Sequence, residues 1–77
     1  MVNRESVIPP WRQLADLLRK QIESGELAPG ARIPSIVSLA QEYELAPVTV
    51  RKAITQLQRE GLVVSQTGWG TYVAERD

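Results

Sequence analysis

Residues 39–64 read LAQEYELAPVTVRKAITQLQREGLVV, and their pattern of apolar residues is the most informative in the chain. Apolar residues recur three and four positions apart on both sides of a three-residue link at 45–47, Leu-Ala-Pro. Such spacing places apolar side chains on one face of a helix. We therefore predict two short helices, at about 36–44 and 47–60, joined by a tight turn. Pro47 suits the first turn of the second helix, where its missing N–H costs nothing.

Residue types at the ends of these helices agree with the proposed bounds. Ser35 is a typical N-cap residue, and Gly61 is typical of the position just after a helix. Each helix should turn one apolar face toward a core. The residues expected on these faces are Ile36, Leu39, Ala40 and Tyr43 in the first helix and Val50, Ala53, Ile54 and Leu57 in the second.

Upstream, a longer helix is predicted over residues 11–24, opened by two prolines and ended by Gly25. Its polar face carries charges four residues apart, and these predict ion pairs between Asp16 and Lys20 and between Arg19 and Glu23. Residues 1–8 are expected to form a flexible leader. The apolar face of this helix comprises Trp11, Leu14, Ala15, Leu18 and Ile22.

Downstream, the pattern changes to extended segments. Residues 62–67 and 71–74 are rich in β-branched and aromatic residues, and residues 68–70, Gly-Trp-Gly, predict a hairpin turn between them. Residues 31–33 could add a very short edge strand. The expected fold class is therefore α+β, mainly α: a winged helix-turn-helix with three helices and a C-terminal β-hairpin wing, forming one domain over residues 9–77.

Composition excludes several classes of protein. The chain has 77 residues, enough for one domain, and contains neither Cys nor His. Disulfides, Cys/His zinc sites and thiol or imidazole catalysis are therefore ruled out. No catalytic motif is present, so we expect no enzyme activity, no cofactor and no metal. With neither a signal sequence nor an apolar run long enough to span a membrane, a cytoplasmic location is expected.

The distribution of charge argues for nucleic acid more than the total does. The net charge is zero, which by itself argues mildly against DNA binding. However, residues 45–74 hold three basic residues and one acidic residue. Arg51, Lys52 and Arg59 have no acidic residue three or four positions away in helix 47–60. In a helix-turn-helix the second helix enters the DNA major groove, and these cations suit that position.

Five residues of the helix pair are candidate DNA contacts. Arg51 is the leading candidate, because arginine in the major groove most often binds guanine. Thr49 could contact a phosphate or a thymine methyl group, or simply cap the helix. Lys52 is expected to bind the DNA backbone. Val48 could contact a thymine methyl group or merely be exposed, and Ser35 could bind a phosphate in addition to capping its helix.

The predicted wing tip, Gly68, Trp69 and Gly70, is also a candidate DNA contact. An indole between two glycines is poorly placed for a core, so Trp69 could enter the minor groove. It could equally fold back onto its own sheet or form a patch for self-association. Trp11 and Tyr43 are expected in the core.

Three stretches, PPWRQLADLLRKQIESGELAPGARIPS, LAQEYELAPVTVRKAITQLQREGLVV and TGWGTYVA, resemble the DNA-binding domain of the GntR family of bacterial transcription regulators. The resemblance covers about residues 9–74. It implies a sequence-specific repressor that binds double-stranded DNA at palindromic operators. Thr49 and Arg51 match the family's recognition helix. At three positions where the family usually has arginine, this chain has Val37, Pro47 and Trp69.

The resemblance also implies what the chain lacks. In this family a further C-terminal domain usually binds an effector and dimerises, so we expect no small-molecule effector site in this chain. At most a weak homodimer is expected, forming only on DNA, in a nucleoid-associated protein. The alternative function is a winged-helix module that binds protein and lacks sequence-specific DNA binding. The unpaired Arg51-Lys52 pair beside Thr49 favours DNA, because a protein-docking surface does not require it.

Overall fold

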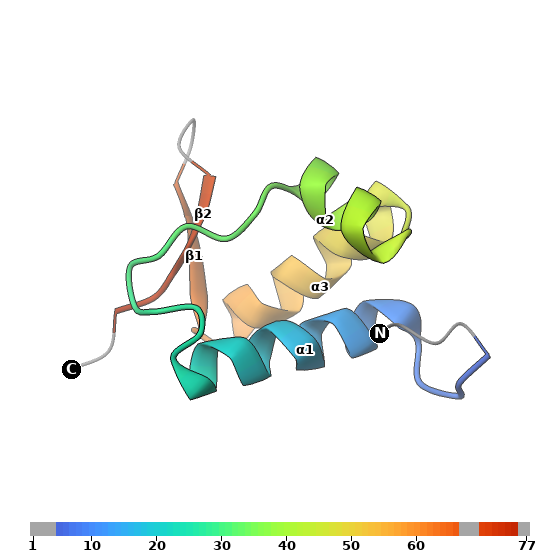
Figure 1. The fold of residues 1–77 in the computed structure, drawn as a ribbon, viewed down its shortest axis with the longest axis horizontal. Coiled ribbons are helices and arrows are strands. Elements are labelled where there is room, and N and C mark those ends of the chain that lie inside the picture. Colours follow the sequence, from blue (N-terminus) through green and yellow to red (C-terminus); the bar gives the residue numbers. More distant parts are fainter. Residues whose placement is uncertain (1–4, 67–69, 76–77) are drawn as a thin grey trace.

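The computed structural model describes residues 5–66 and 70–75. It contains three helices followed by two antiparallel strands (Figure 1), which confirms the predicted fold class and element order. The helix bounds differ from the predicted ones by no more than one residue. The elements are α1 (Pro10–Ser24), α2 (Ile36–Tyr43), α3 (Pro47–Arg59), β1 (Val63–Gln66) and β2 (Gly70–Val73).

The helix ends follow from the residues found there. Pro10 and Pro47 occupy first-turn positions of α1 and α3. Gly25 and Gly61 both have positive φ angles, 88° and 78°, and follow α1 and α3. After α3 the Leu62 N–H donates to the Leu57 carbonyl, a pattern that needs a left-handed residue just beyond the helix. These two glycines therefore fix where the chain leaves each helix.

The turn between α2 and α3 contains a strained residue. Glu44 ends α2 with φ 54° and ψ 47°, and it is the only non-glycine residue with positive φ in the described part of the chain. A side chain in this left-handed region costs about 1–2 kcal/mol. The turn is held by the Leu45 N–H, which donates to the Ala40 carbonyl at 2.9 Å.

Replacing Glu44 with glycine should therefore stabilise the fold. The relief of strain exceeds the extra backbone freedom that glycine gives the unfolded chain, and we expect a gain of about 0.5–1 kcal/mol. Thermal unfolding followed by circular dichroism measures it. Gln41→Gly, at an exposed position inside α2, is the control and should destabilise by about 1 kcal/mol. A lower melting temperature for Glu44→Gly would contradict the strain argument.

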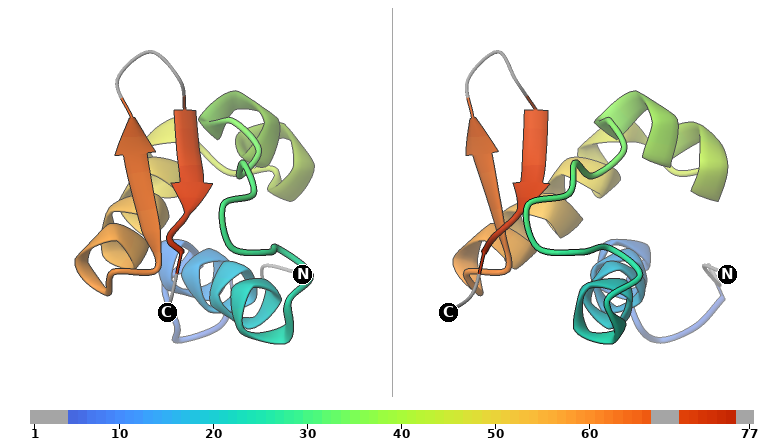
Figure 2. Two further views of the ribbon diagram at one scale, coloured as in Figure 1. Left: turned by 90° about the vertical axis from the view of Figure 1, so that its left-hand side faces the viewer. Right: turned by 60° about the vertical axis from the view of Figure 1, so that its left-hand side comes forward.

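The segment before α2 is joined to the wing. Val63 pairs with Val73 and Gln66 with Gly70 in the hairpin, and Arg32 forms an isolated antiparallel bridge with Tyr72. The segment predicted as a short edge strand at 31–33 therefore lies beside β2, but it forms a single bridge and not a strand. Views from other sides show this segment passing beside β2 on its way to α2 (Figure 2). The wing and the segment that leads into α2 are therefore connected through backbone hydrogen bonds.

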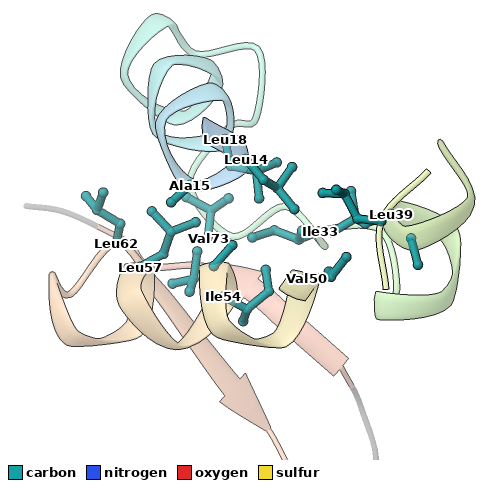
Figure 3. Close-up of a cluster of buried hydrophobic side chains, with 14 residues drawn as sticks. Leu14, Ala15, Leu18, Ile33, Leu39, Val50, Ile54, Leu57, Leu62 and Val73 are labelled. Atoms are coloured by element: carbon teal, nitrogen blue, oxygen red, sulfur yellow. The ribbon is translucent and has the colours of Figure 1, made fainter. Parts of the chain in front are cut away.

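The core lies between α1, α3 and the wing (Figure 3). The four apolar residues predicted on the α3 face are all buried, and Leu57 and Val50 are fully so. Tyr43 is half-buried and packs against the core, whereas Trp11 does not join it. Among the described residues no helix is both long and apolar enough to cross a membrane. The remaining buried residues are Leu14, Ala15, Leu18, Ile33, Leu39, Ala40, Leu45, Leu62, Val63 and Val73.

Candidate nucleic-acid interface

The outer face of α3 is a cationic surface with an apolar floor. Opposite the buried stripe lies a groove of about 410 Å³, and its lining includes Arg51, Lys52 and Arg59 but no acidic residue. The α3 sequence itself, PVTVRKAITQLQR, contains no acidic residue. Val48 also lines this groove and is 72% exposed. The structure thus brings three predicted cations and Val48 together on one open face.

Trp11 belongs to this surface, so its predicted place in the core is wrong. Its ring lies 5.0 Å from the Nζ atom of Lys52, a cation–π distance. Although Trp11 lies on the apolar face of α1, it meets the polar flank of α3 beside Lys52 and Gln56, which is open to solvent. Helical spacing gave no signal for this, because it shows which face a residue occupies and not what lies opposite.

An ion-pair network joins α1 to the residue that follows α3. The Arg19 guanidinium donates to both carboxylate oxygens of Glu60, at 2.7 and 2.6 Å, and to Asp16 on its own helix. Both ion pairs predicted within α1, Asp16 with Lys20 and Arg19 with Glu23, are therefore wrong. Arg19 instead bridges Asp16 and Glu60. The hydrogen bonds from Arg19 and Gln56 lower the pKa of Glu60 below its ordinary value of 4.5.

This network predicts a pH-dependent contribution to stability. A lowered folded-state pKa means that the Glu60 contribution is complete above about pH 4.5 and is lost as the pH falls through the folded value. Glu60→Gln should therefore destabilise the fold at pH 7, by less than about 1 kcal/mol because the pair is partly exposed. The difference from the unsubstituted chain should shrink toward pH 3, as measured by melting temperature.

Glu23→Gln is the matched control, since it removes a carboxylate from the exposed part of α1. We expect it to lower the melting temperature at pH 7 much less than Glu60→Gln does, because Glu23 forms no ion pair among the described residues. An equal destabilisation by Glu60→Gln at both pH values would contradict the assignment of this pH dependence to the Arg19–Glu60 pair.

At the start of α2 the Ser35 side chain accepts a hydrogen bond from the Ser38 N–H at 3.1 Å, which confirms the predicted N-cap. The Ser35 side chain is exposed. Thr49 does not cap α3, because Ala46 is the N-cap residue and the helix start has no side-chain cap. Thr49 is half-buried in the first turn of α3. DNA contacts by Ser35 and Thr49 remain predictions.

The wing is attached to α3 close to the groove. The Gln58 side chain donates to the Ser65 hydroxyl, which links α3 to β1. Gly70 begins β2, is exposed and has φ 111°. Gly68 and Trp69 lie outside the described residues, so the alternatives for Trp69 remain open.

Comparisons with known proteins agree with this architecture. Residues 10–73 match the family model described as bacterial regulatory proteins, gntR family. The chain is 45% identical over 67 residues to the mannosyl-D-glycerate transport/metabolism system repressor MngR of Escherichia coli. It is 36% identical over 74 residues to the HTH-type transcriptional repressor NagR of Bacillus subtilis. These alignments cover 87% and 96% of this chain but only 28% and 30% of the two relatives.

Solved structures show the same fold. YtrA from Sulfolobus acidocaldarius, a GntR-family transcription factor, superposes with a TM-score of 0.92 at 35% identity, covering all of this chain and 81% of that one. The DNA-binding domain of AraR in complex with operator ORR3 superposes with a TM-score of 0.86 at 32% identity, covering 96% of this chain and 89% of that one. Fold, sequence motifs and family match together show that this chain belongs to the gntR family of bacterial regulatory proteins.

Proposed function

We propose that this chain binds double-stranded DNA sequence-specifically and acts in the cytoplasm as the DNA-binding part of a transcription repressor. The observation that carries the proposal is the outer face of α3, which presents Arg51, Lys52 and Arg59 without an acidic neighbour in its groove. The AraR domain of the same fold is bound to operator DNA, which supports this use of the scaffold. In the proposed complex α3 occupies the major groove and the wing lies beside it.

The contact residues divide by the chemistry they offer. Arg51, in the second turn of α3, binds a guanine edge. Lys52, Thr49 and Ser35 bind phosphates and fix the register of the protein on the duplex. Val48, with its exposed apolar side chain, contacts a thymine methyl group. The wing tip at residues 68–70 contacts the DNA beside the major groove.

A palindromic operator is the expected target. Two copies of the chain would bind half-sites about one helical turn apart, as helix-turn-helix dimers do. The dimer is weak in solution and forms on DNA. We infer that these residues bind no small-molecule effector. The alignments cover only 28% and 30% of MngR and NagR, so in a protein of that length effector binding would belong to other residues.

The test is selection of bound duplexes from a random-sequence pool at low salt. Two double variants with the same loss of charge are run beside the unsubstituted chain. One, Arg51→Gln with Lys52→Gln, changes the outer face of α3. The other, Arg12→Gln with Lys20→Gln, changes exposed residues of α1. We expect an enriched inverted repeat for the unsubstituted chain and the α1 variant, and none for the α3 variant.

Other outcomes are equally informative. A single enriched half-site would support sequence reading and overturn the proposed dimer. No enrichment by the unsubstituted chain, even at low salt where phosphate contacts are strongest, would overturn the proposed function. The alternative of a protein-interaction module would then be the next hypothesis to test.

A further inference from the structure

A second groove lies between the start of α2 and the wing, away from the outer face of α3. It has a volume of about 220 Å³ and an apolar floor that includes Ile54. Val37 forms part of its α2 side and is 63% exposed. Gly70 and Thr71 line it from the wing, and no acidic residue lines it. Figure 2 shows the wing and α2 on either side of the segment that crosses between them.

One cation, Arg32, lines this groove. Its backbone is held to the wing on both sides, because the Ile33 N–H donates to the Thr71 carbonyl and the Val73 N–H donates to the Ala31 carbonyl, each at 2.8 Å. Unlike Arg19, the exposed Arg32 guanidinium has no ion pair within residues 5–66 and 70–75.

Gly70 leaves the space that the Arg32 guanidinium occupies. A β-carbon added at Gly70 would lie 3.0 Å from Arg32 Nε and 3.2 Å from Nη2. Such distances are tighter than nine in ten real β-carbon contacts, so a β-carbon at this position would require the Arg32 side chain to shift by a few tenths of an ångström. The glycine at the start of β2 therefore lets the Arg32 side chain lie close against the wing, in addition to allowing φ 111°.

We propose that Arg32 is a DNA-backbone contact of this chain, holding a phosphate in the groove between α2 and the wing. A guanidinium without an ion pair in the described part of the chain suits a phosphate, which it can bind through two parallel hydrogen bonds. The neighbouring Val37 offers no charge, so Arg32 is the cation that serves this side of the interface. The inference rests on the proposed function, because the phosphate belongs to the DNA held by α3.

One feature of the sequence singles out Arg32. Arg32 is the only basic residue between Lys20 and Arg51. It stands in the turn-rich link, and only the backbone bridge to Tyr72 reveals that the link runs along the wing.

The experiment measures affinity for the selected duplex, and for a scrambled duplex, at several salt concentrations. Arg32→Gln is compared with Lys20→Gln, which removes the same charge from the exposed face of α1. We expect Arg32→Gln to weaken binding to both duplexes by about tenfold and to reduce the slope of log affinity against log salt by about 0.9, the value for one phosphate. Lys20→Gln should leave both quantities nearly unchanged.

A double-substitution cycle tests whether the close contact between Gly70 and Arg32 matters for DNA binding. Gly70→Ala should weaken binding in the unsubstituted chain and have a much smaller effect when Arg32 is already glutamine. Because the strain of alanine at φ 111° is common to both backgrounds, the difference isolates the contact with Arg32. Circular dichroism checks that all variants remain folded.

The outcomes separate the two proposals. If the unsubstituted chain binds while Arg32→Gln keeps its affinity and salt slope, the assignment of Arg32 is overturned and the proposed function stands. If Arg32→Gln loses affinity only for the selected duplex, Arg32 reads a base, which also overturns a phosphate contact. If the unsubstituted chain binds neither duplex, the proposed function fails and the inference with it.

Discussion

Replacing Leu57 with alanine is expected to unfold most of the chain at 25 °C. Leu57 is fully buried in the last turn of α3, and it points from that helix toward α1, near Ala15 and Leu62 (Figure 3). A buried leucine replaced by alanine costs about 2–5 kcal/mol. A domain of this size without disulfides rests on about 3–5 kcal/mol in total. The loss is therefore comparable with the whole stability of the fold.

Urea titration followed by far-ultraviolet circular dichroism measures this loss. Val64→Ala is the control, because it also shortens an aliphatic side chain but at a position of β1 that is 45% exposed. It should cost less than about 1 kcal/mol, since mainly the cross-strand contact with Tyr72 is reduced. If the urea midpoint of Leu57→Ala were close to that of Val64→Ala, the core would not depend on Leu57.

Local patterns were sufficient for the helices of this chain. The apolar spacing around Leu57 and Ile54 identified the buried face of α3, because helix geometry alone puts such residues on one side. Ser35 and Gly61 set the ends of helices through hydrogen bonds to nearby backbone groups. Each of these signals lies within a few residues of the feature that it determines.

Contacts between distant residues were not available from such patterns. Arg19 pairs with Glu60, 41 residues away, whereas the spacing rule considers only partners on the same helix. Trp11 is in the apolar stripe of α1, yet its neighbour across the helix interface is the ammonium group of Lys52. Arg32 joins the groove because its segment pairs with β2. All three depend on how the elements pack together.

The candidate interface has features that local sequence patterns predict and features that depend on how the helices pack. The absence of acidic neighbours around Arg51 and Lys52 could be read from the sequence, and the open groove on α3 agrees with it. The contribution of Trp11 to this groove required the packing of α1 on α3.

Arg51→Ala is expected to weaken binding to the selected duplex by about 10- to 100-fold, the range for losing one bidentate base contact. Arg51 is exposed, lies on the open face of α3 and has no acidic residue beside it in the groove. Affinity for a scrambled duplex should fall much less, because a base contact carries sequence information and a phosphate contact does not. Fluorescence anisotropy with labelled duplexes measures both affinities.

Two comparisons define what Arg51 does. Arg51→Lys keeps the charge but loses the planar pair of donors, so it should recover binding to the scrambled duplex and little of the preference for the selected one. Arg59→Ala removes a cation eight residues further along α3, about 12 Å away. It should weaken binding to the selected and the scrambled duplex by the same factor. If Arg51→Ala also weakened both alike, with a salt slope lower by about 0.9, Arg51 would be a backbone contact and the bases would be read by other residues.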